Sequence, residues 1–144
     1  MADSKAYYRN LRDYKYQLIY DYTINIEIDD LEQDVNTNFI ALTTDGLLTV
    51  KKQYAWDGPS GPTIDTRSFM RGSLVHDALY QLMREKYLDY TKHRNYADKL
   101  LKKICLADGM FKFRAWYVYK AVRMFSEKNA RPFTEPKDEI ICVP

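Results

Sequence analysis

The sequence has few of the residues that cross-link a small protein or bind a metal. Among 144 residues there are two cysteines, Cys105 and Cys142, which lie far apart and form no CxxC pattern. The sequence therefore indicates neither a disulfide framework nor a zinc knuckle. A chain of this length buries enough surface to fold without such links. We expect one domain, residues 1–144, in a reducing compartment.

The sequence also lacks a strong charge bias and a long hydrophobic run. Its formal net charge is +2, and the Lys and Arg residues are spread along the chain, which does not favour a nucleic-acid partner. No stretch approaches the roughly 20 apolar residues of a membrane span. Residues 1–10 lack the apolar segment of a signal peptide. We expect a protein that is not transmembrane and is not secreted by a signal peptide.

Alternation of apolar and polar residues in the first third predicts antiparallel strands. From Tyr16 to Ile28 every second residue is Tyr, Leu or Ile, a period typical of a half-buried strand. Residues 39–44 and 47–54 flank Asp45-Gly46, a dipeptide that suits a tight hairpin turn. We therefore expect sheet within residues 1–54.

Helical spacing replaces this alternation in the second half. Gly and Pro residues predict an irregular loop over residues 55–66. Apolar residues then predict helices over about residues 68–88, 92–108 and 113–128, with Gly109 as a cap of the second. The proline-containing tail, residues 129–144, is predicted to be extended. The expected fold class is α+β, an N-terminal antiparallel sheet with a hairpin followed by a three-helix segment.

Polar residues gather where the first two predicted helices would meet. On a helical wheel His76 lies about 100° from the buried position Val75, at the edge of the core. Asp98 has the same relation to Ala97. The short link between these helices predicts an antiparallel pair, in which His76, Tyr80 and Asp98 converge. The simpler alternative is a half-buried histidine bonded to a loop carbonyl.

Four further residues belong to the predicted cleft, and each has a structural alternative. Asp57 and Ser60 either face the cleft or tighten a Pro/Gly turn. Trp56 is either a wall of a ligand pocket or a core anchor. Arg94 either lines the cleft or forms an ion pair with Asp98, four residues later on the same helix.

The order of a Gly-rich loop, the run His76-Asp77-Ala78-Leu79-Tyr80 and then Asp98 resembles the active-site layout of the secreted and parvoviral phospholipase A2 enzymes. The resemblance covers about residues 54–109. It implies that His76 is the general base, that Asp77 binds calcium and that Asp98 orients the histidine. It also implies that Tyr80 supports Asp98 by a hydrogen bond.

The same resemblance implies a calcium loop that contains Gly58 and Gly61. Calcium binds oxygen ligands and would polarise an ester carbonyl, while a histidine held by a carboxylate takes a proton from water. This loop departs from the family's pattern, because Asp57 intrudes and Pro59 and Pro62 remove backbone donors. The disulfides of the secreted enzymes are also absent.

The sequence is also similar, over about residues 47–125, to a family of small bacteriophage-encoded proteins of unknown function. The matching segments are Asp57-Gly58-Pro59-Ser60, Leu74-Val75-His76-Asp77-Ala78-Leu79-Tyr80, Arg94-Asn95-Tyr96-Ala97-Asp98 and Ala121-Val122-Arg123-Met124-Phe125. This similarity implies a viral origin, with a place in the host cytoplasm or the virion. It implies no activity.

Two hypotheses about function follow. The first is calcium-assisted hydrolysis of an ester, such as a phospholipid. The second is a non-catalytic binding module, a virion component or counter-defence factor, that binds a small ligand or a protein through the same cleft. The run His76-Asp77 also resembles the metal-dependent HD phosphohydrolases, but the sequence does not favour them, because they need an upstream histidine and this chain has none before His76. A third possibility is that the polar residues only fix the loop to the helices. The oligomeric state is left open.

Overall fold

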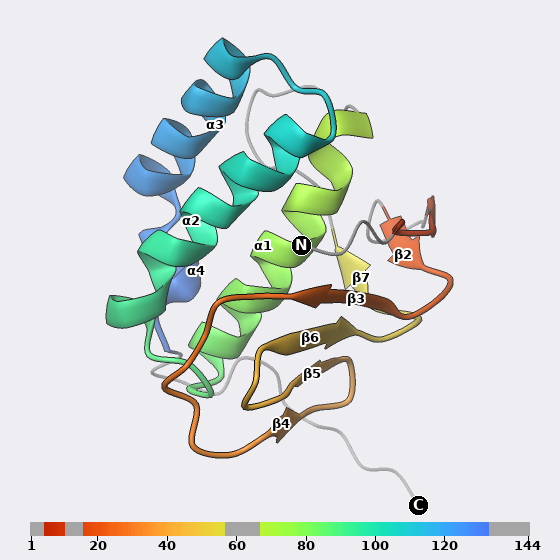
Figure 1. Cartoon of the computed structure of the whole chain (residues 1–144), viewed down its shortest axis with the longest axis vertical. Coiled ribbons are helices and arrows are strands. Elements are labelled where there is room, and N and C mark those ends of the chain that lie inside the picture. The colour runs from red at the N-terminus through yellow and green to blue at the C-terminus, as the bar shows by residue number, and fades with distance from the viewer. Residues whose placement is uncertain (1–4, 11–15, 57–66, 133–144) are drawn as a thin grey trace, which may run out of the picture.

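The computed structural model describes residues 5–10, 16–56 and 67–132. The predicted cleft residues Asp57, Gly58, Ser60 and Gly61 lie outside these ranges. The elements are, in chain order, β1 (Tyr8–Asn10), β2 (Tyr16–Leu18), β3 (Tyr22–Asn25), β4 (Val35–Asn36), β5 (Ile40–Leu42), β6 (Leu47–Val50), β7 (Ala55–Trp56), α1 (Arg67–Arg84), α2 (Tyr90–Ala107), α3 (Lys112–Phe125) and α4 (Glu127–Ala130). The predicted α+β class, with sheet before helices, is confirmed (Figure 1).

The strands form two antiparallel sheets, with the orders β1-β2-β7 and β3-β6-β5-β4. The predicted strand from Tyr16 to Ile28 is in fact divided between them, because β2 pairs with β1 and β7 while β3 pairs with β6. Ile19 and Tyr20 are exposed at the bend. The carboxylate of Asp21 fixes this bend by accepting a hydrogen bond from the backbone N–H of Lys52 at 2.7 Å.

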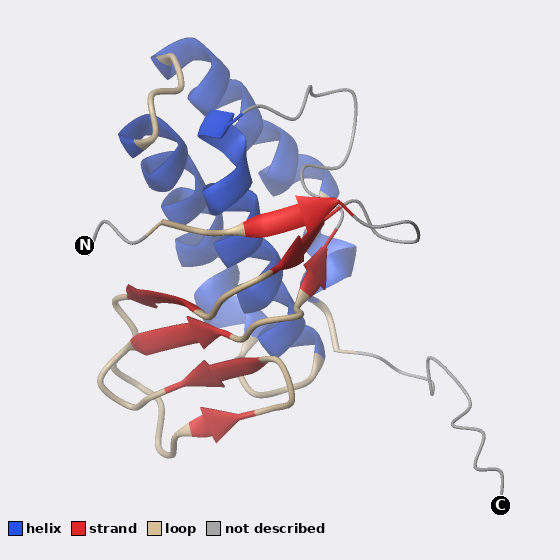
Figure 2. Ribbon diagram, turned by 90° about the vertical axis from the view of Figure 1, so that its right-hand side faces the viewer, coloured by secondary structure: helices blue, strands red, loops and turns tan. Residues whose placement is uncertain are grey.

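Helix α1 packs beside α2, which lies between α1 and α3 (Figure 1), and the helical layer lies on one side of the strands (Figure 2). Nearly every side chain from Phe69 to Met83 is buried, because the helix packs on the sheets and on α2. A Cβ atom on Gly72 would lie 3.0 Å from both the Sγ atom of Cys105 and a methyl group of Leu101, so the two helices approach closely there. This approach brings polar side chains of α1 within reach of α2.

The ends of the helices are fixed by local contacts. Helix α1 ends at Arg84, earlier than predicted, where Lys86 takes a positive φ of 69°. Asp89 then caps α2 by accepting a hydrogen bond from Thr91 N–H at 2.9 Å. At the other end of α2, Gly109 adopts a φ of 97° and donates to the carbonyl of Leu106, as the predicted glycine cap requires. The predicted third helix is interrupted at Ser126 and continues as α4, so residues 127–130 are helical.

The predicted hairpin at Asp45-Gly46 joins β5 to β6. Gly46 has a φ of 96°, a backbone conformation that residues with a side chain rarely adopt. Its carbonyl also accepts a hydrogen bond from the N–H of Ile26 at 2.8 Å, which ties the turn to the chain that follows β3. A Cβ atom at Gly46 would lie 2.2 Å from the carbonyl oxygen of Ile26. The position therefore excludes side chains for two separate reasons.

We predict that Gly46→Ala lowers the free energy of unfolding by about 3 kcal/mol, from the strained φ and the steric clash together. Gly109→Ala is the matched control, because Gly109 also has a φ of 97° but a Cβ atom there would meet nothing within 4 Å. The Gly109→Ala substitution should lower the free energy of unfolding by about 1 kcal/mol. Urea unfolding of both variants measures the two losses. Equal losses would contradict the role assigned to the Ile26 carbonyl.

Candidate functional site

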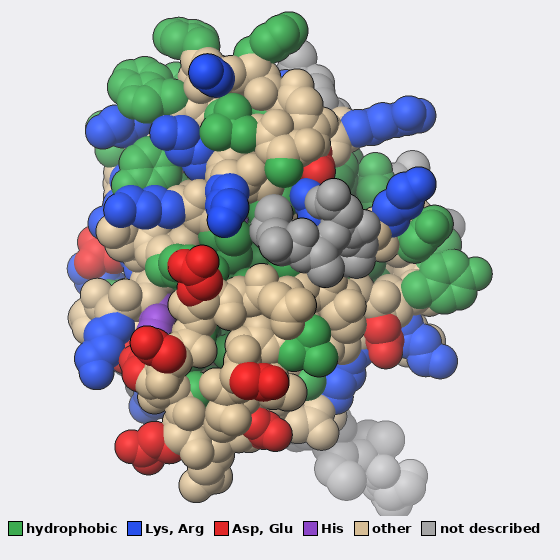
Figure 3. Space-filling view, in the orientation of Figure 1, with side chains coloured by type: hydrophobic (Ala, Val, Ile, Leu, Met, Phe, Trp, Pro, Cys, Tyr) green, Lys and Arg blue, Asp and Glu red, His purple; other side chains and the backbone are tan. Residues whose placement is uncertain are grey.

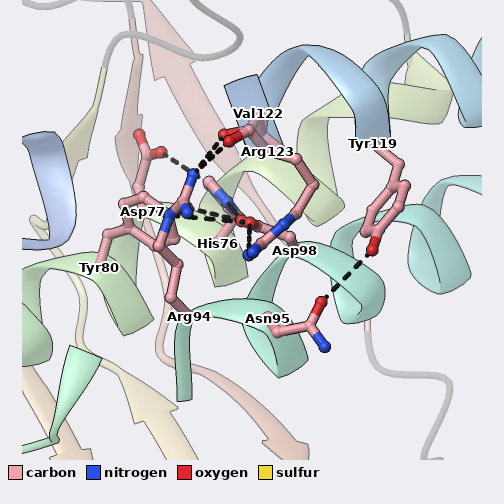
Figure 4. A network of polar contacts seen from close by, with 9 residues as sticks. All are labelled: His76, Asp77, Tyr80, Arg94, Asn95, Asp98, Tyr119, Val122 and Arg123. Carbon is pink, nitrogen blue, oxygen red and sulfur yellow. Dashed lines mark hydrogen bonds and ion pairs between the residues drawn. The ribbon is translucent and has the colours of Figure 1, made fainter. Parts of the chain in front are cut away.

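A fully buried carboxylate, that of Asp98 on α2, lies at the centre of a polar network between three helices (Figure 4). One of its oxygens, Oδ1, lies 2.7 Å from Nε2 of His76 and accepts a hydrogen bond from the hydroxyl of Tyr80 at 2.6 Å. His76 and Tyr80 stand one turn apart on α1, and their ring centroids are 4.1 Å apart. The structure therefore brings together the three residues that the sequence places at the predicted site.

The second oxygen of Asp98, Oδ2, accepts a hydrogen bond from the guanidinium of Arg123 on α3 at 2.9 Å. Arg94 lies farther from this oxygen, with its Nε atom 3.9 Å away. It donates instead to the hydroxyl of Tyr80 at 3.2 Å and to the carbonyls of Val122 and Arg123 at 2.9 and 2.7 Å. Arg94 thus caps the carboxyl end of α3, and Oδ1 of Asp98 stays available to His76.

The network keeps Asp98 ionised although it is buried. Burial by itself would raise the pKa of Asp98, but the hydrogen bonds from His76, Tyr80 and Arg123 outweigh it and lower the pKa. Burial would likewise lower the pKa of His76, yet the carboxylates of Asp77 and Asp98 raise it above its ordinary value. The pKa of Tyr80 is raised by burial and by Asp98, so its hydroxyl remains a donor.

The geometry fixes the tautomer of His76. An ionised carboxylate only accepts hydrogen bonds, so Nε2 carries the proton that faces Asp98. In the neutral ring the other nitrogen, Nδ1, then holds a lone pair. This atom lies 3.9 Å from Oδ1 of Asp77, whose side chain is 37% exposed, whereas His76 itself is 7% exposed. The nitrogen that can accept a proton, Nδ1, is therefore on the side of the ring that faces Asp77.

Trp56 is the one predicted cleft residue of the loop region that the structure describes, and it lies in the core. Its Nε1–H donates to the hydroxyl of Ser73 at 3.2 Å. Its ring contacts those of Tyr8, Tyr16 and Tyr54. Trp56 therefore matches the alternative of a core anchor.

The described residues supply little of a metal site. No group of three or more His, Cys, Asp or Glu side chains within residues 5–10, 16–56 and 67–132 is arranged to hold a metal ion. At the candidate site Asp77 offers one partly exposed carboxylate, while Asp98 is already occupied by three donors. A calcium ion beside Asp77 would need further oxygen ligands, because one carboxylate does not complete its coordination.

A hollow of about 710 Å³ lies away from this network. It is lined by Lys5, Ala6, Tyr7, Tyr8, Arg67, Met70, Arg71, Ala107 and Asp108. Arg71 is held there by a two-pronged ion pair with Asp108, with distances of 2.7 and 3.0 Å. The hollow therefore contains none of the residues of the His76 network.

Known proteins give no further identification. No family model, curated protein or solved structure matches this chain. The phospholipase A2 and bacteriophage resemblances thus stay predictions that rest on the motifs alone. None of the helices in the described part of the chain combines the length and hydropathy that a membrane span requires.

Arg123 is the member of the network that the sequence does not assign. It lies in the segment Ala121-Val122-Arg123-Met124-Phe125, which the phage resemblance includes without a role. No local pattern places it beside Asp98, 25 residues earlier, because the contact depends on how α3 folds back on α2.

We predict that Asp98→Asn lowers the free energy of unfolding by about 3–5 kcal/mol, because it leaves the donors His76, Tyr80 and Arg123 without their anion. Asp30→Asn is the matched control. It breaks the 3.1 Å contact of a second His–Asp pair, with His93, at a more exposed carboxylate, and should cost less than about 1 kcal/mol. Urea unfolding compares the two, and similar losses would contradict the central position of Asp98.

Proposed function

We propose that the protein is a hydrolase in which His76 is the general base and Asp98 the carboxylate that orients it. The observation that supports this best is the 2.7 Å contact between Nε2 of His76 and Oδ1 of Asp98, which leaves Nδ1 as the proton acceptor. Tyr80 steadies the same oxygen, and Arg123 steadies the other. The substrate class we propose is an ester, such as a phospholipid, from the motif order His76-Asp77, Tyr80, Asp98.

In the proposed reaction each residue of the network has a part. A water molecule at Nδ1 of His76 loses a proton to that nitrogen, and its oxygen bonds to the carbonyl carbon of the ester. The π electrons of the C=O bond move to the carbonyl oxygen, and they re-form the C=O bond when the alcohol leaves. The imidazolium that forms has one N–H toward Asp98 and the other toward Asp77, so both carboxylates stabilise it. The proton then passes to the alcohol oxygen as the ester C–O bond breaks.

Calcium is part of this proposal through Asp77. A bound calcium ion would polarise the ester carbonyl and stabilise the negative charge that develops on its oxygen. Asp77 suits this role because its carboxylate is partly exposed and lies 3.9 Å from the reacting nitrogen. The similarity to phage proteins adds the host cytoplasm or a virion as the proposed setting.

A second candidate, a non-catalytic binding module of a phage, is favoured by one observation. His76 is 7% exposed, and the polar groups of Tyr80, Arg94 and Asp98 all have partners, as in a network that only fixes the helices. In that case His76 holds α1 against α2, and a small ligand or a protein binds without being changed. The two candidates differ in whether removal of the Nδ1 lone pair affects a reaction.

We predict that the wild type hydrolyses a short-chain phosphatidylcholine or a p-nitrophenyl ester in the presence of calcium. His76→Gln keeps a donor to Asp98 but no proton acceptor, so the rate should fall roughly 10²–10⁴-fold while the fold persists. His93→Gln is the control, because His93 pairs with Asp30 away from the network, and it should retain activity.

The pH profile of kcat/KM gives the second readout of the same experiment. The neutral form of His76 is the base, and its pKa is raised above the ordinary value of 6.5. Activity should therefore rise with pH as His76 loses its proton. If the wild type does not hydrolyse either substrate, or if His76→Gln and the wild type react at equal rates, the binding module becomes the better proposal.

Calorimetric titration of calcium separates the metal from the base. Binding to the wild type that is lost in Asp77→Asn, with unchanged unfolding, supports the calcium part of the proposal. Absence of binding at millimolar calcium removes calcium but leaves the His76–Asp98 chemistry to be judged by the assay above.

A further inference from the structure

Helix α3 has an apolar face on each of two opposite sides. Its inner face, with Ala115, Val118 and Val122, packs against α1 and α2. About 180° away around the helix lie four large side chains, Phe113, Trp116, Tyr117 and Met124. Phe113 and Met124 are 77% and 72% exposed, and the other two are about half exposed. A surface helix normally buries one apolar face and exposes a polar one, so the outer face indicates a partner.

Cations are interleaved with these apolar side chains. The chain from Gly109 to Ser126 contains no Asp or Glu. Lys120 lies between the outer residues, with its ammonium group 5.9 Å from the ring of Trp116. Lys102 of the neighbouring helix lies 5.8 Å from the ring of Tyr119. Figure 3 shows hydrophobic and basic side chains gathered together at the upper left, over α3. A partner that fits this face therefore carries negative charge at its surface and has an apolar layer below that surface.

The opposite charge gathers on the sheet. Residues 16–50 contain seven Asp and Glu residues and no Lys or Arg, and acidic side chains appear in the lower part of Figure 3. The charge is therefore unevenly distributed, with an acidic segment at residues 16–50 and a basic one at residues 109–126. A negatively charged surface would attract the α3 end and repel the sheet, which orients the molecule before contact.

We propose that the outer face of α3 docks on an anionic lipid surface. Phe, Trp and Tyr side chains favour the boundary between head groups and acyl chains, while lysines extend from their apolar stems toward anionic head groups. Phe111, the N-cap residue of α3, and Phe125, its last residue, are strongly exposed as well.

This docking does not depend on whether His76 is catalytic. The docking face and the His76 network are nevertheless linked, because α3 supplies both the outer face and Arg123, which binds Asp98. Vesicle binding without calcium, by the wild type and by His76→Gln alike, would show that the docking is independent of the proposed reaction.

The test is cosedimentation in calcium-free buffer with vesicles of phosphatidylcholine alone and of phosphatidylcholine and phosphatidylglycerol in equal parts. The wild type should bind the anionic vesicles and shift the emission of Trp116 to shorter wavelength. Lys120→Glu should weaken binding roughly tenfold. The double variant Phe113→Ser, Trp116→Ser should weaken it at least about tenfold, because it removes the apolar anchors.

The matched control is the double variant Tyr20→Ser, Phe39→Ser, which removes two exposed aromatic residues from the sheet end and should bind as the wild type does. Thermal unfolding confirms that each variant folds. Equal binding to both vesicle types, or binding that survives loss of Phe113 and Trp116, would overturn the proposal. The proposal would also be overturned if vesicles did not bind and the outer face instead joined two copies of the chain or bound single-stranded RNA.

Discussion

A single buried carboxylate sets the arrangement of the helices. An ion removed from water costs several kcal/mol unless hydrogen bonds replace its hydration. Asp98 receives these bonds from His76 and Tyr80 on α1 and from Arg123 on α3, while it belongs itself to α2. Three helices are thereby fixed at one point. Arg94 adds a second connection, because it joins Tyr80 to the carboxyl end of α3.

The same constraint gives His76 its chemical character. A ring that donates from Nε2 to Asp98 has its basic lone pair on Nδ1, on the side of the partly exposed Asp77. If the network had only a structural role, any neutral hydrogen-bond donor at position 76 would satisfy Asp98 equally well. The proposed hydrolase and the proposed binding module therefore share one structure and differ in whether Nδ1 exchanges a proton with a substrate water.

Much of this arrangement follows from the sequence, where local patterns suffice. Helical spacing places His76 and Asp98 at the margins of two helices that a short link makes antiparallel, and Asp45-Gly46 marks the hairpin. The period-two pattern, in contrast, runs without interruption across the bend at Tyr20, so it hides the change from one sheet to the other. Arg123 is missed because its contact with Asp98 depends on tertiary packing of α3. Aromatic residues spread around α3 in the sequence and predict a helix that packs on two sides or meets a partner, but the structure is needed to tell its inner face from its outer one.

The state of the His76 ring, measured by ¹⁵N and ¹H NMR of labelled protein across a pH titration, tests the role of Asp98 most directly. We expect a neutral ring protonated at Nε2, with a slowly exchanging proton shared with Asp98, and an Nδ1 that titrates with a pKa above 6.5. A neutral ring protonated at Nδ1, or a pKa below that value, would contradict the assignment of Asp98 as the carboxylate that holds the histidine.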